Sequence, residues 1–299
     1  MSAKKWVRRS VRQIRRALKK QGYSLSRSSV WRLLKKLNYG LHANRKRFTG
    51  APHPSRDQQM RYLGRVKQLF LAAGHAVISV DTKKKELIGN FKNPGRLWGR
   101  QPEQVNAHDF AQAASAKAVP YGLYDLVHNE GYVYVGTSAD TAELAVEAIV
   151  RWWTDPDRPR FRDESKVLIL CDAGGSNSYR SRLWKQQLQA RLVDQLGLEV
   201  MVCHYPTGAS KWNPVEHRLF SYISLNWAGK PLRTLETMLG YIRDTTTETG
   251  LKVKAFLLER EFEKGIKVPD EVMDGLNLIP RPICPYWNYI IRPTATSSA

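Results

Sequence analysis

The sequence predicts an α/β protein with a mixed β-sheet and flanking helices, preceded by a small helical segment. Two observations predict this class. After Gly74, short apolar runs alternate with longer stretches in which apolar residues recur every three to four positions. Before that point, two short helical patterns lie in a strongly basic background. The 299 residues are 42% hydrophobic, enough to bury a sizeable core, so a globally disordered chain is excluded.

Positive charge is concentrated at the start of the chain. The sequence has 48 Lys and Arg against 27 Asp and Glu, a formal net charge of +21. Residues 1–67 hold 20 of the basic residues and one acid, Asp57, whereas in residues 68–299 the numbers of basic and acidic residues are nearly equal. A localised basic segment indicates a polyanionic partner, most commonly nucleic acid. The alternative is a basic tail that only aids solubility.

Residues 1–39 are expected to form two short helices joined by a tight turn at Gln21-Gly22-Tyr23, with Ser26 or Ser28 capping the second. Their apolar positions are Val11, Ile14 and Leu18, then Val30, Leu33, Leu34 and Leu37. This pattern is typical of a helix-turn-helix motif, whose second helix enters the major groove, although a plain helical hairpin is the alternative. The residues expected to contact DNA are Arg32, Lys35 and Lys36. Because only ten residues precede the first helix, the motif is expected to be incomplete.

Residues 40–56 are expected to be a basic linker along the DNA backbone, with Arg45, Lys46 and Arg47 as contacts. Ser55-Arg56-Asp57-Gln58 has the pattern of a capping box that opens a helix reaching about Ala73. The expected apolar face of that helix is Met60, Leu63, Val66, Leu69 and Phe70.

The remaining elements follow in a recognisable order. Strands are expected over 76–80, 87–91, 132–135, 167–171 and 199–203, and helices over 141–153, 179–196 and 214–227. The inward residues of the first and last of these helices are expected to be Leu144, Ile149 and Trp153, then Leu219, Tyr222 and Ile223. The order β-β-β-α-β-α-β-α is that of the ribonuclease-H-like fold, in which the first strand lies beside the fourth.

Three acids occupy informative places in that fold. Asp81 and Asp172 each follow an apolar strand, and Glu216 lies near the start of the last helix. Strand ends in an open α/β sheet are where sites collect, so the two aspartates are expected to be neighbours facing Glu216. Clustered carboxylates repel one another unless a cation binds. Their oxygen ligands suit Mg²⁺ or Mn²⁺, and two such ions support phosphodiester cleavage.

Each acid also has an ordinary structural interpretation. Asp81 can be a strand-end turn residue, and Asp172 can begin the turn that runs through Gly174-Gly175. Asn213, Pro214 and Glu216 together have the pattern of a capping box. The three acids on the expected elements in the expected order favour catalysis.

Further residues near these acids are candidate DNA contacts. They are Lys83, Lys84, Lys85, Lys211, Trp212 and His217. The lysines after Asp81 can equally form a solvated hairpin edge, Trp212 can belong to the core, and His217 can serve in capping or packing.

Several long motifs resemble the Rhodopirellula-type DDE transposases of bacterial insertion sequences. The resemblance runs from about residue 28 to residue 293. Its motifs include Val80-Asp81-Thr82-Lys83-Lys84-Lys85-Glu86-Leu87-Ile88-Gly89-Asn90-Phe91, Val105-Asn106-Ala107-His108-Asp109-Phe110, Pro120-Tyr121-Gly122-Leu123-Tyr124-Asp125, Asp172-Ala173-Gly174-Gly175-Ser176-Asn177 and Ser210-Lys211-Trp212-Asn213-Pro214-Val215-Glu216-His217.

The resemblance implies an integrase-like transposase that cuts DNA at element ends and joins the 3′ ends to target DNA, using two Mg²⁺ or Mn²⁺ ions. It implies that Asp81, Asp172 and Glu216 are the catalytic, metal-binding triad, with 43 residues between the last two. Residues 57–293 are then the catalytic domain with a C-terminal extension, and 294–299 a disordered tail. A catalytically inactive or truncated remnant that only binds DNA is the alternative, and a plain nuclease shares the same site.

The expected partners are the terminal repeats of the element and the target DNA, both double-stranded, bound by a homo-oligomer. The sequence contains no run of about 18 apolar residues, which would indicate a membrane span, and no apolar secretory segment opens the chain. The three cysteines are far apart, which fits a reduced compartment. We therefore expect a cytoplasmic bacterial protein associated with the nucleoid.

Overall fold

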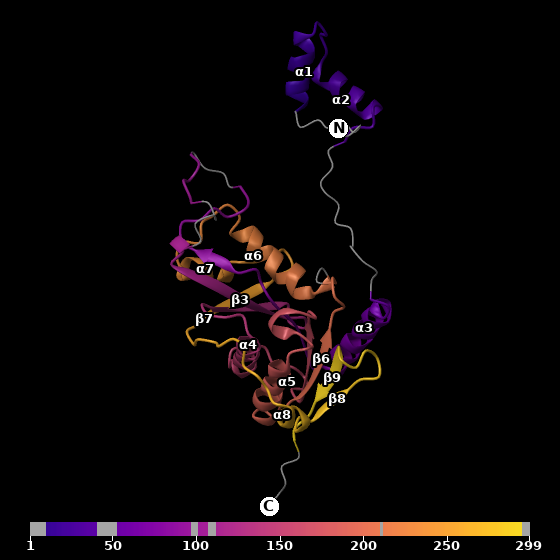
Figure 1. The fold of residues 1–299 in the computed structure, drawn as a ribbon, viewed down its shortest axis with the longest axis vertical. Coiled ribbons are helices and arrows are strands. Elements are labelled where there is room, and N and C mark those ends of the chain that lie inside the picture. The colour runs from indigo at the N-terminus through magenta and orange to yellow at the C-terminus, as the bar shows by residue number, and fades with distance from the viewer. Residues whose placement is uncertain (1–9, 41–52, 97–100, 107–111, 210–211, 295–299) are drawn as a thin grey trace, which may run out of the picture. The chain divides into compact units, whose positions relative to one another are not determined.

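The computed structural model describes residues 10–40, 53–96, 101–106, 112–209 and 212–294 (Figure 1). The chain divides into two compact units, Met1–Pro52 and His53–Ala299. Within the described residues, no helix combines the length and apolarity needed to cross a membrane.

The first unit contains the two expected helices, α1 (Val11–Lys20) and α2 (Arg27–Lys36). Ser26, rather than Ser28, caps α2, because its hydroxyl accepts a backbone N–H from the first turn at 3.0 Å. Val30 is the buried side chain of α2, and α1 buries none of its side chains. These two helices therefore bury little apolar surface against each other.

The second unit is built on a nine-stranded mixed sheet. Its strands are β1 (Ala76–Thr82), β2 (Glu86–Ile88), β3 (Ala116–Asp125), β4 (Glu130–Gly136), β5 (Lys166–Cys171), β6 (Glu199–His204), β7 (Lys252–Leu258), β8 (Leu278–Pro280) and β9 (Asn288–Ile291). They lie in the order β7-β4-β3-β1-β5-β6-β9-β8, and β2 pairs with β3.

The middle of the sheet has the ribonuclease-H-like arrangement. β3 is antiparallel to both β1 and β4, whereas β5 and β6 run parallel to β1. The expected adjacency of the first apolar strand and strand 167–171 is confirmed by the β1–β5 pairing. β7 extends one side of this core, and the C-terminal β9 and β8 extend the other.

The sequence pattern does not predict the long strand β3. The expected second strand, 87–91, is present only as the three-residue β2 beside β3. β3 escapes prediction because it contains Pro120 and Gly122, which are both uncommon inside strands. Pairing along both of its edges and burial over most of its length outweigh that unfavourable propensity.

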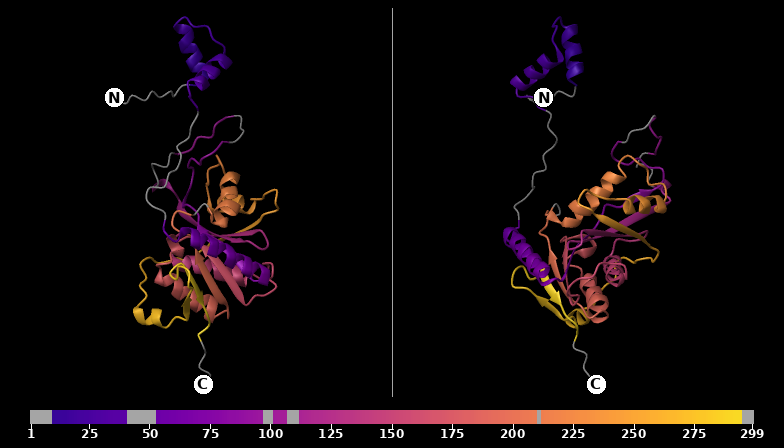
Figure 2. Two further views of the ribbon diagram at one scale, coloured as in Figure 1. Left: turned by 90° about the vertical axis from the view of Figure 1, so that its right-hand side faces the viewer. Right: turned by 180° about the vertical axis from the view of Figure 1, so that it is seen from behind.

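Helices cover both faces of the sheet (Figure 2). They are α3 (Arg56–Ala73), α4 (Ala142–Thr154), α5 (Arg182–Leu188), α6 (Ser221–Asn226), α7 (Leu235–Arg243) and α8 (Asp270–Asp274). A 3₁₀ turn, η2 (Gly175–Asn177), and two π-helical segments, η3 (Gln189–Asp194) and η5 (Glu216–Phe220), accompany them. The expected helix 179–196 therefore begins only at Arg182, and the expected helix 214–227 contains a wider turn before α6.

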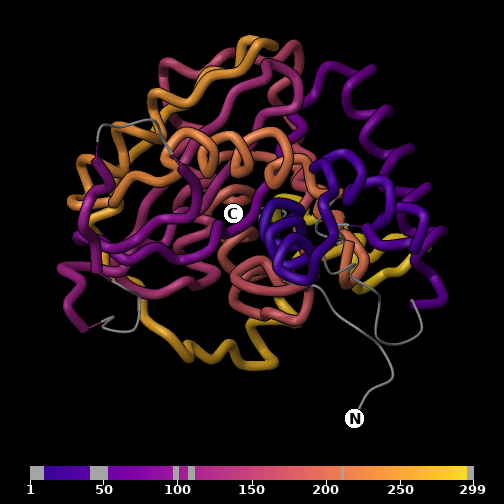
Figure 3. The backbone as a smooth tube through the Cα atoms, turned by 90° about the horizontal axis from the view of Figure 1, so that it is seen from above, coloured from indigo at the N-terminus to yellow at the C-terminus, as the bar shows by residue number. Residues whose placement is uncertain are grey.

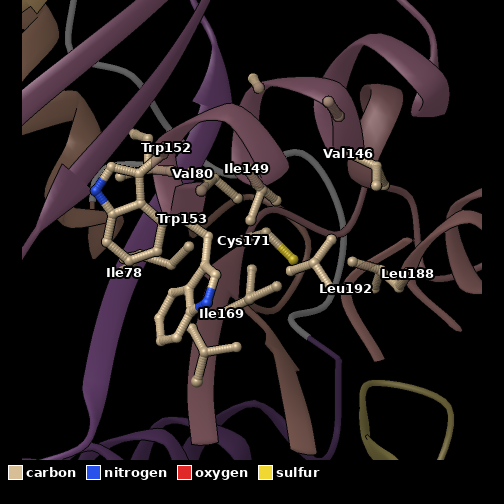
Figure 4. Packing of buried hydrophobic residues seen from close by; sticks show 14 of the residues in the cluster. Ile78, Val80, Val146, Ile149, Trp152, Trp153, Ile169, Cys171, Leu188 and Leu192 are labelled. Carbon is tan, nitrogen blue, oxygen red and sulfur yellow. The ribbon is translucent and has the colours of Figure 1, made fainter. Parts of the chain in front are cut away.

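Alternation along the strands divides the core between the two faces. In β1, Ile78 and Val80 pack with α4 and α5, whereas Val77 packs with α3 on the opposite face. Figure 4 shows the first of these clusters, where the labelled strand residues meet Trp152 and Ile149 of α4. The η5–α6 segment lies on the same face as α3, above β3 and β4, and its orange turns cross the sheet in the view of Figure 3.

Three local expectations are wrong. Leu69 of α3 is 60% exposed and Tyr222 of α6 is 39% exposed, although the apolar spacing places both inward. Ser55 makes no capping hydrogen bond with its side chain, so the expected capping box before α3 does not form. The inward face of α3 instead includes the fully buried Gln59, whose amide exchanges hydrogen bonds with Asn288 of β9. The spacing of apolar residues cannot predict a buried polar pair of this kind.

Candidate active site

Asp81 and Asp172 occupy neighbouring positions on neighbouring strands. Val80 pairs with Cys171 across the parallel β1–β5 ladder, and each acid is the next residue along the chain. Asp81 still belongs to β1, and its carboxylate accepts the Thr82 N–H at 2.7 Å. The expected meeting of the two aspartates at this edge of the sheet is therefore present in the structure.

Glu216 approaches from the segment that crosses this face of the sheet. Asp81 pairs with Gly122 of β3, and the ring of Phe220 packs on Gly122. Since directly paired residues present the same face, Asp81 faces the layer that contains η5. Glu216 is half-buried in the first turn of η5. The three acids thus come from two strand ends and one helix.

The capping-box interpretation of Glu216 is wrong. The side-chain oxygen of Asn213 accepts a hydrogen bond from the Ser79 hydroxyl, and its amide nitrogen lies 3.4 Å from an Asp172 carboxylate oxygen. Asn213 therefore turns toward the sheet instead of capping its own helix. The Glu216 N–H bonds to the backbone carbonyl of Asn213 at 3.1 Å. The Glu216 carboxylate is left available for another role.

The electrostatics of the site disfavour three ionised carboxylates. Burial, and then the charge of Asp172, raise the pKa of Asp81 from 3.8 to about 8, against the opposing hydrogen bond from Thr82. Burial raises the pKa of Asp172, although Asn213 opposes it. Burial and the charge of Asp172 raise the pKa of Glu216, and the nearby Lys83 and His217 oppose this rise. A cation placed among these groups would remove both the repulsion and part of the cost of desolvation.

A fourth carboxylate, Asp140, stands beside the expected three. One of its oxygens accepts a hydrogen bond from the Thr82 hydroxyl at 2.9 Å, and that hydroxyl also lies 3.1 Å from the Ser176 hydroxyl. Asp140 contributes to the raised pKa of Asp81. The sequence analysis missed it because it follows no apolar strand directly and stands just before the N-cap of α4, where acids are common.

The acids line two openings that have lysines in common. Asp81, Asp140 and Asp172 line a hollow of about 350 Å³ with Lys83, Lys84 and Lys85. Glu216 and His217 line a larger groove of about 1240 Å³, whose wall also includes Lys83 and Lys84. Oxygen donors of this kind suit Mg²⁺ or Mn²⁺. Among the described residues, however, no three Asp, Glu, His or Cys side chains are grouped so that they could hold a metal ion.

The basic and aromatic candidates differ in their surroundings. Lys83 is buried, bonds to Glu86 at 2.7 Å and lies 4.6 Å from the centre of the Trp227 ring. Trp212 is 52% exposed, so the alternative that it belongs to the core is wrong. His204 at the end of β6 is not one of these candidates: it is fully buried, with its ring nitrogens near two backbone carbonyls, and burial lowers its pKa to about 4.

The remaining candidate DNA contacts belong to the first unit or lie outside the described residues. Arg32, Lys35 and Lys36 are all exposed on α2, and the Lys35 ammonium lies 5.7 Å from the centre of the Trp31 ring. Arg45, Lys46, Arg47 and Lys211 fall outside the residues that the structure describes.

The sheet order and the acids at the ends of β1 and β5 define a ribonuclease-H-like protein with an acidic strand-end site. The chain belongs to the family described as the Rhodopirellula transposase DDE domain, whose sequence profile matches residues 1–293. The resemblance seen in the motifs is therefore confirmed, and it extends to the first residue. The protein is a member of a transposase family.

Solved structures of the Mos1 transposase show a distant similarity to this chain. A Mos1 paired-end complex with the left transposon end is 15% identical, with 81% of this chain and 72% of that chain covered and a TM-score of 0.45. A Mos1 mariner paired-end complex with Mn is 13% identical over the same shares, also with a TM-score of 0.45. The Mos1 strand transfer complex is 15% identical, covers 81% and 71%, and has a TM-score of 0.43. No curated protein matches the sequence.

Proposed function

We propose that this protein is an active DDE transposase that cleaves DNA at insertion-sequence ends and joins the freed 3′ ends to target DNA. The observation that carries the proposal is the juxtaposition of Asp81 and Asp172 across the β1–β5 ladder, under the helix that carries Glu216. Membership of a transposase family supports it. The elevated pKa of all three acids supports a site that works with bound cations.

The residues that would hold the cations are Asp81, Asp172 and Glu216, the groups whose charges repel in the metal-free protein. Two Mg²⁺ or Mn²⁺ ions, when bound, would supply charge stabilisation for the attacking and leaving oxygens. The protein itself holds the two aspartates at a rigid sheet edge, and the η5–α6 segment carries the third acid. Lys84 and Lys85, which line the hollow with the aspartates, would attract the phosphate backbone.

The proposed reaction has two displacements at phosphorus. In cleavage, a water oxygen bonds to the phosphorus, the bond to the 3′ oxygen breaks, and the 3′ oxygen takes up a proton. In joining, that 3′ hydroxyl attacks a target phosphodiester and displaces the target's own 3′ oxygen. One P–O bond forms and one breaks in each step, so no oxidant or energy carrier is required.

DNA recognition is proposed to begin in residues 1–39 as a helix-turn-helix segment. The exposed Arg32, Lys35 and Lys36 on α2 support this role, as does the concentration of positive charge before residue 68. Residues 40–56 would follow the backbone as a linker, and 57–293 would carry the chemistry. We further propose that two or more copies act together, since an element has two ends, and that the protein works on the bacterial nucleoid.

The test is a reaction of the purified protein with labelled duplexes that carry the inverted repeats flanking its gene, a target plasmid and Mg²⁺. Label joined to the plasmid supports the transposase. Cleaved but unjoined label identifies a nuclease of the same fold. Bound but intact DNA identifies a remnant that acts as a DNA-binding protein.

A further inference from the structure

The strand that carries Asp81 contains one buried hydroxyl among aliphatic side chains. Ser79 is fully buried between Ile78 and Val80, where an unbonded hydroxyl would cost free energy. It lies two residues before Asp81 and therefore points to the same face of the sheet. The contacts it makes on that face connect the strand to the helix of Glu216.

The Ser79 hydroxyl has both a donor and an acceptor role. It accepts the backbone N–H of Val215 at 3.0 Å, and it donates to the side-chain oxygen of Asn213. The N–H groups in the first turn of a helix have no partner within the helix, and a side chain of the same segment usually binds one of them. Here a strand residue that is 136 positions away in the sequence does so. The start of the Glu216 helix is thus bonded to β1 itself.

Asn213 extends this contact to the second acid. Its amide nitrogen lies 3.4 Å from both the Val80 carbonyl oxygen and an Asp172 carboxylate oxygen. The Val80 carbonyl oxygen only accepts hydrogen bonds, so the NH₂ must face that side, which is also the side of Asp172, and the amide oxygen must face Ser79. Asn213 is fully buried, which limits its freedom to adopt another arrangement. One amide therefore touches β1 and Asp172, three residues before Glu216.

We propose that Ser79 and Asn213 are positioning residues that set the placement of Glu216 relative to Asp81 and Asp172. The inference rests on the proposed function of the three acids as cation ligands. Neither residue would touch the reacting phosphate. Together they link the backbone beside Asp81, the carboxylate of Asp172 and the first turn of the Glu216 helix. Groups that orient metal ligands in this way typically change metal affinity or activity by about 10–100-fold when removed.

The structure offers a matched control for loss of a buried amide. Asn288 of β9 is also fully buried, and it also connects distant segments, through its paired hydrogen bonds with Gln59. Within the described part of the chain, its side chain bonds to Gln59 and to the backbone carbonyls of Ile283 and Cys284, and to none of the three acids. Asn288→Ala should therefore lower stability without disturbing the arrangement of the acids.

The experiment measures Mn²⁺ binding to the full-length protein without DNA, by electron paramagnetic resonance of the free ion. We compare the native protein, Ser79→Ala, Asn213→Ala, the double variant and Asn288→Ala, each well below its melting temperature. We expect about 10–100-fold weaker binding in both single variants. The double variant should lose little more Mn²⁺ affinity than either single variant, because both substitutions break the hydrogen bond between Ser79 and Asn213. Asn288→Ala should bind like the native protein.

Equal Mn²⁺ affinity in Asn213→Ala and the native protein would overturn the inference and leave the proposed function standing. Equal losses in Asn213→Ala and Asn288→Ala would also overturn it, since the effect would then be general destabilisation. If Asp81→Asn binds Mn²⁺ as well as the native protein, the proposed function itself fails. These outcomes separate the two claims.

A second variant covers the possibility that Asn213→Ala does not fold. Asn213→Asp has nearly the same size and retains the oxygen that accepts from Ser79, but it turns a carboxylate oxygen toward Asp172. On the DNA-cleavage reaction we expect kcat to fall at least about tenfold with KM for DNA unchanged, because DNA affinity comes from phosphate contacts elsewhere. An unchanged kcat would overturn the role assigned to the Asn213 amide nitrogen.

Discussion

The ring of Phe220 lies against the backbone of Gly122, the residue that pairs with Asp81 across β1 and β3. A β-carbon at Gly122 would collide with that ring. Phe220 ends the turn that begins with Glu216, so the missing side chain at Gly122 allows the third acid to approach the first. The close contact explains why a glycine occupies the middle of a paired, buried strand.

Gly122→Ala should therefore disturb both packing and activity. We expect the unfolding free energy to fall by about 1–3 kcal/mol, typical of overpacking, together with slower DNA cleavage because the Glu216 helix must shift. Thermal melts and cleavage rates check this. Gly240→Ala in α7 is the control, since among the described residues no atom outside the neighbouring turns of its own helix lies within 4 Å of the added carbon, and it should be neutral or slightly stabilising. A Gly122→Ala protein with native stability and rate would contradict the argument.

Removing any one of the three acids should abolish cleavage while DNA binding persists. Asp81→Ala, Asp172→Ala and Glu216→Ala each remove a carboxylate, and we expect the rate to fall at least about a hundredfold. Binding should change little because affinity comes mainly from phosphate contacts. Cleavage assays beside filter binding make the comparison. Glu216→Gln is the informative variant, and full activity in it would show that Glu216 holds no cation.

Divalent ions should stabilise the folded protein through Asp81 and Asp172. Mn²⁺ that binds only the folded state raises the melting temperature by mass action. The rise should shrink in the Asp81→Asn/Asp172→Asn double variant, which has less negative charge to offer. Thermal melts of both proteins with and without millimolar Mn²⁺ measure this. Equal shifts in the two proteins would place the ion elsewhere.

The affinity for Mn²⁺ should rise with pH. The pKa of Asp81 is raised from 3.8 to about 8 in the folded metal-free protein, mainly by burial, so this carboxyl holds a proton that the ion must displace. We expect up to about tenfold tighter binding per pH unit below pH 8, and a plateau above it. Titrations at several pH values test this slope, which should flatten in Asp81→Asn.

The raised pKa of Asp81 also makes the stability of the folded protein depend on pH. Because the folded pKa of Asp81 lies above its unfolded value, the folded protein binds the proton more tightly. This contribution to stability is complete below the unfolded pKa and disappears as the pH rises toward 8. In the metal-free protein this contribution of Asp81 should therefore decline over that range, and Mn²⁺ should offset the decline. Denaturant titrations with and without the ion provide the measurement.

The basic first unit should dominate the salt dependence of DNA binding. Residues 1–50 contain 16 Lys and Arg and no acid. Deleting them should flatten the slope of log affinity against log salt by about 0.9 for each DNA phosphate that these residues neutralise in the full-length protein. In the full-length chain, Arg32→Gln/Lys35→Gln/Lys36→Gln should produce part of that change. An unchanged slope in both proteins would mean that this segment does not bind DNA.

The local periodicity of apolar residues was sufficient to predict those helices and strands whose burial follows a simple pattern. The apolar runs before Asp81 and Asp172 are the strands β1 and β5, and the spacing of Leu144 and Ile149 marks the buried side of α4. Periodicity did not predict β3, because Pro120 and Gly122 are unfavourable inside a strand. Pairing with strands on both edges stabilises β3 nevertheless. Periodicity also failed at Leu69 and Tyr222, because apolar spacing cannot say where the neighbouring layer ends.

The amino-acid sequence was enough to establish the charge asymmetry and to predict two aspartates at the ends of neighbouring strands. These features depend on residues close together in the chain, whose periodicity and polarity express local preferences. Three contacts became visible only in the folded protein: Asn213 turns from its own helix toward Ser79, Asp140 lies beside the acids, and the Phe220 ring packs on Gly122. The hydrogen bonds of Asn213 and Asp140 join residues 134 and 58 positions apart in the chain. Such pairings depend on which groups meet when the layers pack, and no local propensity encodes that.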